Sequence, residues 1–406
     1  MPVDFVKLNK GPVVVIDDYI GKEEYIDKII SKIEGRGLPV LKYTDLDKAD
    51  KEISNICFSN FIILDWLLYP EEIPIGASIG DELKEDLNKK KIEFIRKVRN
   101  VCFSPIFIFS TISEDGIEED IEKLLKENNL LYSDYRKNFI FIRNKQEILE
   151  NLFKEINKWI VENPHIYLSN IWLNQFLKNS NEVFWSLYEK NSNWPNVFYK
   201  SFEEDGEDPT SGLNDILFRL VRAKMDLSNI DDEILKNSIE ELNVGEIKAL
   251  YGEIMYLKGN IDDIKPGDIY KDGGKYYINI RPECDTTQIG NVDINETYIY
   301  LIKGKKEKDD WVKKNCYGKE YGLLNRPIFY ILPFLDGKNF VKFTFEDLEI
   351  KKYSDIKDKK LYRLLPPFIT SFQHHFSSFL GRYGVPKVPQ EVFDEIFKKK
   401  DENNAR

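Results

Sequence analysis

Three aspartates follow apolar runs that are typical of buried strands. Asp17 and Asp18 come directly after the run VVVI at 13–16, and Asp65 comes after the run FIIL at 61–64. Unbroken runs of this kind predict strands that are buried on both faces, as in a parallel sheet covered by helices. Because the carboxyl ends of such strands form the ligand-binding edge, the three carboxylates should meet there. Carboxylates gathered at one point favour a cation, and all-oxygen ligation suits Mg²⁺.

Hydroxyl and basic side chains follow two further apolar runs. Ser110 and Thr111 come after one of them, and Arg143 and Lys145 come after the other. A carboxylate can act as a nucleophile toward phosphorus and form an aspartyl phosphate. A hydroxyl and a cation beside that carboxylate would bind the new phosphoryl oxygens. The sequence alone does not choose between Arg143 and Lys145 for the cationic role.

Strand and helix patterns alternate five times over the first 160 residues. This alternation predicts an α/β fold with a five-stranded parallel sheet, strand order 2-1-3-4-5, and helices on both faces. The expected strands lie at 13–16, 38–41, 61–64, 105–109 and 139–142, and the expected helices at 22–35, 45–55, 81–100, 116–128 and 146–161.

The stretch of roughly residues 11–160 resembles the flavodoxin-like receiver domain of two-component response regulators. The matching pieces are the acidic pair Asp17-Asp18 after the first strand, Asp65 after the third and Ser110 after the fourth. The resemblance implies that Asp65 is the phosphoacceptor and takes part in holding Mg²⁺ with Asp17 and Asp18. It also implies that Ser110 is the switch hydroxyl, with Thr111 as the fallback.

Two departures from the receiver pattern concern the basic position and the spacing. Receivers usually have Lys-Pro after the fifth strand, where this chain has Arg143-Asn144-Lys145, and Ser110 lies 45 residues after Asp65, a longer interval than in the family. The longer form resembles divergent receivers of bacterial conflict and anti-phage operons, which stand beside a histidine-kinase-like ATPase. Because pseudo-receivers keep the fold and lose the chemistry, a scaffold without phosphorylation is left open.

The rest of the chain has a different texture. We expect a receiver-like domain at 1–162, a helical and aromatic-rich region at 163–262, a small β-rich domain at 263–396 and a disordered tail at 397–406. The β-rich part should form a small barrel or a curled antiparallel sheet, because short aromatic and β-branched strands alternate there with turn signals.

A second possible site lies in the C-terminal half. Cys284 and Asp285 with His374 and His375 would offer metal ligands, and Cys284 is a possible nucleophile. Adjacent histidines on a helix point about 100° apart, so a packing role is favoured for both. Cys284-Asp285 and Arg382 belong to turns similar to those downstream of the divergent receivers, and no chemistry is assigned to them.

Charge and cysteine usage limit the partners. The formal net charge of −11 argues against nucleic-acid binding, the four separated cysteines favour a reduced cytoplasm, and no apolar run predicts a membrane span. The expected function is response-regulator-like signalling between a histidine-kinase-like ATPase, or another signalling protein, and an effector protein. The resemblance to the divergent receivers suggests a role in phage defence. The alternative from another class is an effector enzyme, a nuclease or hydrolase gated by the receiver.

Overall fold

The structure is a computed structural model of the chain. It describes residues 11–395 apart from 57, 70–79, 112–113, 128–138, 207, 229, 238–242, 259–262, 283–284, 286–292, 317–327, 336–338, 383–388 and 393. The chain divides into two compact units, one made of residues 1–194 and 215–240 and the other of residues 195–214 and 241–406. Each unit is described separately below.

The first unit is built on a five-stranded sheet in which every neighbouring pair is parallel. The observed strand order β2-β1-β3-β4-β5 confirms the predicted order. The second strand begins two residues later than expected, and the fourth strand includes Ser110. The strands are β1 (Val13–Ile16), β2 (Val40–Tyr43), β3 (Ile62–Leu64), β4 (Ile106–Ser110) and β5 (Ile140–Asn144).

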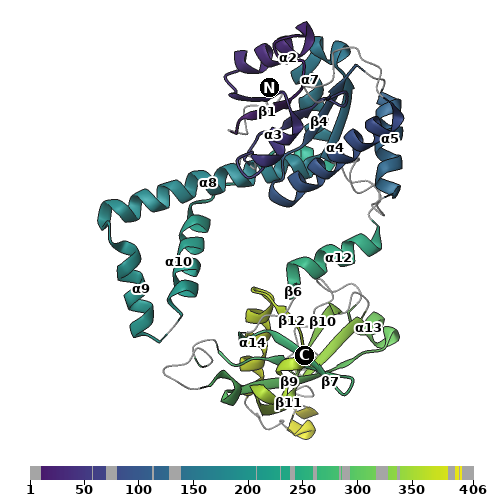
Figure 1. Cartoon of the computed structure of the whole chain (residues 1–406). Coiled ribbons are helices and arrows are strands. Elements are labelled where there is room, and N and C mark those ends of the chain that lie inside the picture. Colours follow the sequence, from purple (N-terminus) through teal and green to yellow (C-terminus); the bar gives the residue numbers. More distant parts are fainter. Residues whose placement is uncertain are drawn as a thin grey trace, which may run out of the picture. The chain divides into compact units, whose positions relative to one another are not determined.

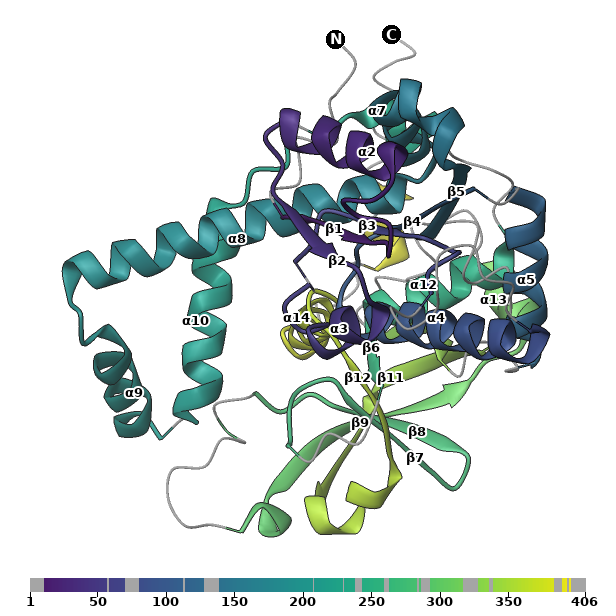
Figure 2. The same cartoon turned by 45° about the horizontal axis from the view of Figure 1, so that its top comes forward.

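Helices cover both faces of this sheet, so the predicted α/β architecture is confirmed (Figure 2). Side chains of successive strand residues point to opposite faces: Val13 and Val15 pack with α2 and α7, whereas Val14 and Ile16 pack with α3, α4 and α5. Both clusters are fully apolar, and they fix the strand ends that carry the acidic residues. The helices are α2 (Glu24–Gly35), α3 (Leu46–Lys51), α4 (Asp81–Val101), α5 (Glu114–Glu127) and α7 (Lys145–Glu162).

A long helical segment follows the sheet. Ile166, Tyr167 and Ile171 near the start of α8, together with Ile234 of α11, join the core on the α2–α7 face. The beginning of the helical segment is therefore packed onto the receiver-like sheet. The segment contains α8 (Pro164–Lys190), α9 (Trp194–Glu204), α10 (Pro209–Lys224), α11 (Asp232–Asn237) and α12 (Val244–Met255).

The second unit contains an antiparallel half-barrel of seven strands. The predicted curled antiparallel sheet is therefore confirmed (Figure 1). Its strand order is β10-β11-β9-β8-β7-β12-β6, and α14 places Phe372 in the core. The strands are β6 (Tyr256–Lys258), β7 (Asp268–Asp272), β8 (Lys275–Asn279), β9 (Tyr298–Lys306), β10 (Phe329–Leu335), β11 (Asn339–Lys352) and β12 (Lys360–Leu364). The helices are α13 (Asp309–Cys316) and α14 (Phe368–Leu380), with 3-10 turns η2 (Ile294–Glu296), η4 (Tyr353–Asp355) and η5 (Lys357–Lys359).

The sequence contains no apolar run that predicts a membrane-spanning helix. In the described part of the chain, no helix combines the length and the apolar character needed to cross a bilayer.

Candidate functional site

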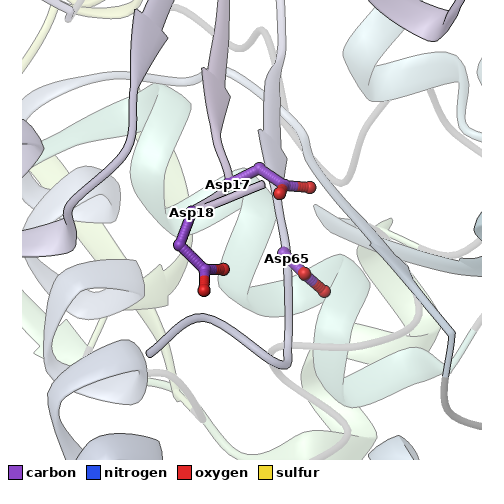
Figure 3. Close-up of side chains that lie close together, drawn as sticks. All are labelled: Asp17, Asp18 and Asp65. Atoms are coloured by element: carbon purple, nitrogen blue, oxygen red, sulfur yellow. The ribbon is translucent and has the colours of Figure 1, made fainter. Parts of the chain in front are cut away.

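Two adjacent parallel strands bring the three aspartates together. Ile16 of β1 lies in register with Leu64 of β3, so the residues that follow them leave the sheet side by side. The main-chain N–H of Asp65 still donates to the carbonyl of Ile16, at 3.0 Å. One carboxylate oxygen from each of Asp17, Asp18 and Asp65 lies within 4.8 Å of the other two. Figure 3 shows the three side chains close together. This group could hold a metal ion.

Asp17 and Asp65 are buried, Asp18 is half-buried, and the three carboxylates are only partly hydrogen-bonded. Asp17 is fully buried and Asp65 is 1% exposed. Asp17 Oδ1 accepts from the main-chain N–H of Tyr19 at 2.9 Å, and Asp65 Oδ1 accepts from that of Leu67 at 3.1 Å. Asp18 Oδ1 is buried and receives no hydrogen bond from the residues that the structure describes. Burying a carboxylate oxygen without a partner costs free energy. The site therefore fits a hard cation that prefers oxygen ligands, such as Mg²⁺.

Lys145 is the basic group of the site. Its Nζ lies 2.7 Å from Asp17 Oδ2, 2.8 Å from Asp65 Oδ2 and 3.5 Å from Glu23 Oε2. Lys145 is the first residue of α7, where the side chain of Asn144 caps the helix by accepting from the N–H of Gln146. One buried ammonium thus faces several carboxylates, and the site keeps a negative excess that a divalent cation would offset.

The electrostatics of the site shift the pKa of both flanking aspartates upward. Burial, with the charge of Asp65 as the second cause, raises the pKa of Asp17 to about 7 and that of Asp18 to about 6. Burial works against the charged form of Lys145, but the carboxylates of Asp65 and Asp17 outweigh it and raise the Lys145 pKa. A cation that binds the aspartates must therefore displace protons near neutral pH.

Ser110 and Thr111 have different surroundings at the end of β4. Ser110 is fully buried on the strand next to β3, and its hydroxyl has no hydrogen-bond partner in the described part of the chain. Thr111 is exposed. A buried hydroxyl without a partner has an open acceptor and donor, which a ligand oxygen at this edge would use.

Arg143 is engaged away from the three aspartates. Its Nη1 lies 3.2 Å from Glu114 Oε2 and donates to the carbonyl of Ile142 at 2.8 Å, and the guanidinium lies over the ring of Phe141. Of the two basic candidates after the fifth strand, the structure brings Lys145 and not Arg143 into contact with the aspartates.

The residues proposed for a second site are only partly described. Cys284 lies outside the described residues, next to Asp285. The His374 and His375 rings lie 5.9 Å apart at 85°, and His375 Nδ1 lies 2.7 Å from the carbonyl of Ser371 one turn earlier. Arg382 donates to the carbonyl of Phe379 at the end of the same helix. Among the described residues, the aspartate group is the cluster whose geometry could hold a metal ion.

Two charged residues at the site were missed from the sequence. Glu23 contacts Lys145, but an acidic residue before a helix is common and carries no special signal. Lys91 is buried and donates to the main-chain oxygen of Trp66, the residue after Asp65. Its signal was available, because Lys91 falls at helical spacing between apolar positions of α4 and so lies on the inner face.

Comparisons with known proteins add little to this description. No known protein family and no curated protein matches the sequence. Among solved structures, a fusion containing the yeast Spc42 trimeric coiled coil matches with 12% identity and a TM-score of 0.26, covering 45% of this chain and 97% of that one. A likeness at that TM-score defines no fold. The class of the first unit therefore follows from its own geometry: a receiver-like, flavodoxin-type fold with an acidic triad at the carboxyl edge of its sheet.

Proposed function

We propose that this chain is a response-regulator-like signalling protein in which Asp65 accepts a phosphoryl group. The observation that carries the proposal is the position of Asp65: its Oδ2 lies 2.8 Å from Lys145 Nζ, inside a group of three carboxylates at the end of a parallel sheet. A nucleophilic carboxylate, a metal-binding acidic pair and a fixed cation are the groups that phosphoryl transfer to an aspartate requires.

The proposed step transfers a phosphoryl group from a histidine nitrogen to a carboxylate oxygen of Asp65. A partner of the histidine-kinase-like class presents a phosphohistidine, and a carboxylate oxygen of Asp65 attacks its phosphorus. The new O–P bond forms as the N–P bond breaks, and the leaving imidazole takes up a proton. Asp17, Asp18 and Asp65 would hold Mg²⁺, whose charge would neutralise the oxygens of the transferred group.

Lys145 and Ser110 have distinct roles in this proposal. Lys145 binds one of the new phosphoryl oxygens, exchanging part of its contact with Asp65 for a contact with the phosphate. Ser110 donates its hydroxyl hydrogen to another phosphoryl oxygen, a partner that the hydroxyl does not find among the described residues. Both changes occur at the ends of β4 and β5, so the surface around these strands differs between the two states.

The output of the switch is proposed to be a protein contact. The phosphorylated unit would control an effector protein or the C-terminal half-barrel of its own chain, and the resemblance to receivers of conflict operons suggests phage defence. The alternative of a gated nuclease or hydrolase would be favoured by a pocket that brings together Cys284, Asp285, His374 or Arg382. Cys284 lies outside the described residues, and no specific observation favours this alternative.

The test is phosphorylation with a small phosphodonor. The full chain is incubated with Mg²⁺ and acetyl phosphate, and intact mass spectrometry is expected to show one added phosphoryl group that is labile to base. Asp65→Asn should remain unmodified, whereas Asp115→Asn, which changes an exposed aspartate on α5, should be modified like the wild type. Absence of modification in the wild type, or equal modification of Asp65→Asn, would leave a pseudo-receiver scaffold as the better account.

A further inference from the structure

Lys91 of α4 is a buried cation outside the group of residues that contact Asp65 directly. Its side chain is 2% exposed. The Nζ donates to the main-chain oxygen of Trp66 and, at 3.3 Å, to Asn88 Oδ1. Both acceptors are neutral, and burying an ammonium group against neutral oxygens costs free energy. The direct contacts of the Lys91 ammonium therefore leave its charge without an opposite charge.

The acidic cluster acts on Lys91 from a distance. Burial lowers the pKa of Lys91 to about 8, while the negative charges of Asp65 and Asp18 oppose that shift. The ammonium therefore stays largely protonated at neutral pH and lies in the field of the aspartates. Lys145 contacts Asp65 itself, whereas Lys91 holds the main chain of the residue that follows Asp65.

Trp66 and Asn88 extend this contact to a second helix. The buried Trp66 donates its indole N–H to Asp120 Oδ2 of α5 at 3.2 Å, and Asn88 Nδ2 donates to the same oxygen at 3.3 Å. The Lys91 ammonium also lies 5.3 Å from the centre of the Trp66 ring. One hydrogen-bonded network thus joins the residue after Asp65 to both α4 and α5.

We propose that Lys91 is a positioning residue that transmits the charge of Asp65 to helices α4 and α5. This inference rests on the proposed function, because the change in charge is the phosphoryl group on Asp65. Added negative charge beside Trp66 attracts the Lys91 ammonium. Since that ammonium also holds Asn88, a shift of Lys91 alters both hydrogen bonds to Asp120 and the packing of α5 against α4.

The experiment separates ligand binding from the response of the helices. The full chain is titrated with Mg²⁺ and beryllofluoride, which stands for the phosphoryl group; fluorine NMR measures occupancy, and hydrogen exchange is followed in peptides covering 81–101 and 114–127. Wild type is expected to change exchange in both peptides. Lys91→Met should bind beryllofluoride to a similar extent and lose most of that change. Lys90→Met, an exposed neighbour on the same helix, should respond like the wild type.

Each outcome bears on one of the two proposals. If the wild type binds no beryllofluoride, the proposed function fails and takes this inference with it. If it binds and Lys91→Met still shows the full exchange response, only the role of Lys91 is refuted. Trp66→Phe, which keeps an aromatic ring but lacks the N–H donor to Asp120, decides the case if Lys91→Met does not fold. A full response of α5 in Trp66→Phe would overturn the inference.

Discussion

Replacing Lys145 by Met tests the electrostatic account of the site most directly. The change removes the ammonium that lies 2.7 Å from Asp17 Oδ2 and 2.8 Å from Asp65 Oδ2, and it keeps a similar volume. Lys145 and both aspartates are almost completely buried, so the variant leaves buried carboxylates without their cation. Removing one partner of a buried ion pair typically costs about 3–5 kcal/mol. We expect a loss of that order in the free energy of unfolding of the first unit at pH about 8 without Mg²⁺.

The same variant should respond more strongly to the metal. Without the neighbouring ammonium, the aspartates attract a cation more strongly, so Mg²⁺ should bind Lys145→Met more tightly than wild type and recover most of the lost stability. Urea denaturation with and without Mg²⁺, together with calorimetric Mg²⁺ titration, measures both effects. Because the phosphoryl oxygens would lack the Lys145 ammonium, acetyl phosphate should modify Lys145→Met more slowly than wild type.

The matched control is Lys158→Met on the same helix. Lys158 is exposed and lies 3.9 Å from Glu162, a surface pair that contributes at most about 0.5 kcal/mol. If Lys145→Met and Lys158→Met lose the same stability, or if Mg²⁺ stabilises Lys145→Met less than it stabilises wild type, the assignment of Lys145 as the counter-charge of the aspartates is wrong.

Two further predictions concern the aspartates and the hydroxyl. Because the folded-state pKa of Asp17 is about 7 against 3.8 in the unfolded chain, the native state holds the extra proton between these values. Without Mg²⁺, the contribution of Asp17 to the free energy of unfolding therefore falls as pH rises through this window. Urea denaturation across the window should show a smaller decrease in stability for Asp17→Asn than for wild type. A larger decrease would contradict the raised pKa of Asp17. Ser110→Ala removes a buried hydroxyl that has no partner among the described residues. The free energy of unfolding should therefore change by no more than about 1 kcal/mol. The variant should still bind beryllofluoride with a weaker exchange response at the end of β4, and a much larger loss of stability would show that Ser110 has a partner.

Local sequence was enough to place the sheet and its acidic edge. The runs 13–16 and 61–64 are apolar at every position, which fits only strands covered on both faces, and the residue type changes sharply to aspartate where each run ends. Strand order followed because right-handed crossovers allow few arrangements of five parallel strands. The order in turn placed Asp17, Asp18 and Asp65 at one edge.

The choice between Arg143 and Lys145 depended on contacts that sequence spacing does not encode. Arg143 lies in β5 and forms an ion pair with Glu114 of α5. Lys145 is the first residue of α7, and that helix sets the direction of its side chain. Where the strand stops and the helix starts is decided by the Asn144 cap, and such boundaries are the least certain part of a sequence prediction. Helical spacing places Lys91 on the inner face of α4, but its contact with Trp66, which follows β3, is not encoded in that spacing.

The negative charges of the site can explain why two lysines, Lys145 and Lys91, are buried near the aspartates. In the resting state, three carboxylates face Lys145 with Lys91 nearby, and both lysines are buried. On the proposed chemistry, Asp65 exchanges its single negative charge for a phosphoryl group of about −2. Together with Asp17 and Asp18 the negative charge is then about four, and Glu23 beside Lys145 adds one more. Mg²⁺ with Lys145 and Lys91 would offset about four of these charges. Without Lys91 the negative excess would be larger by one charge, so on the proposed chemistry the second lysine would stabilise the phosphorylated state more than the resting one.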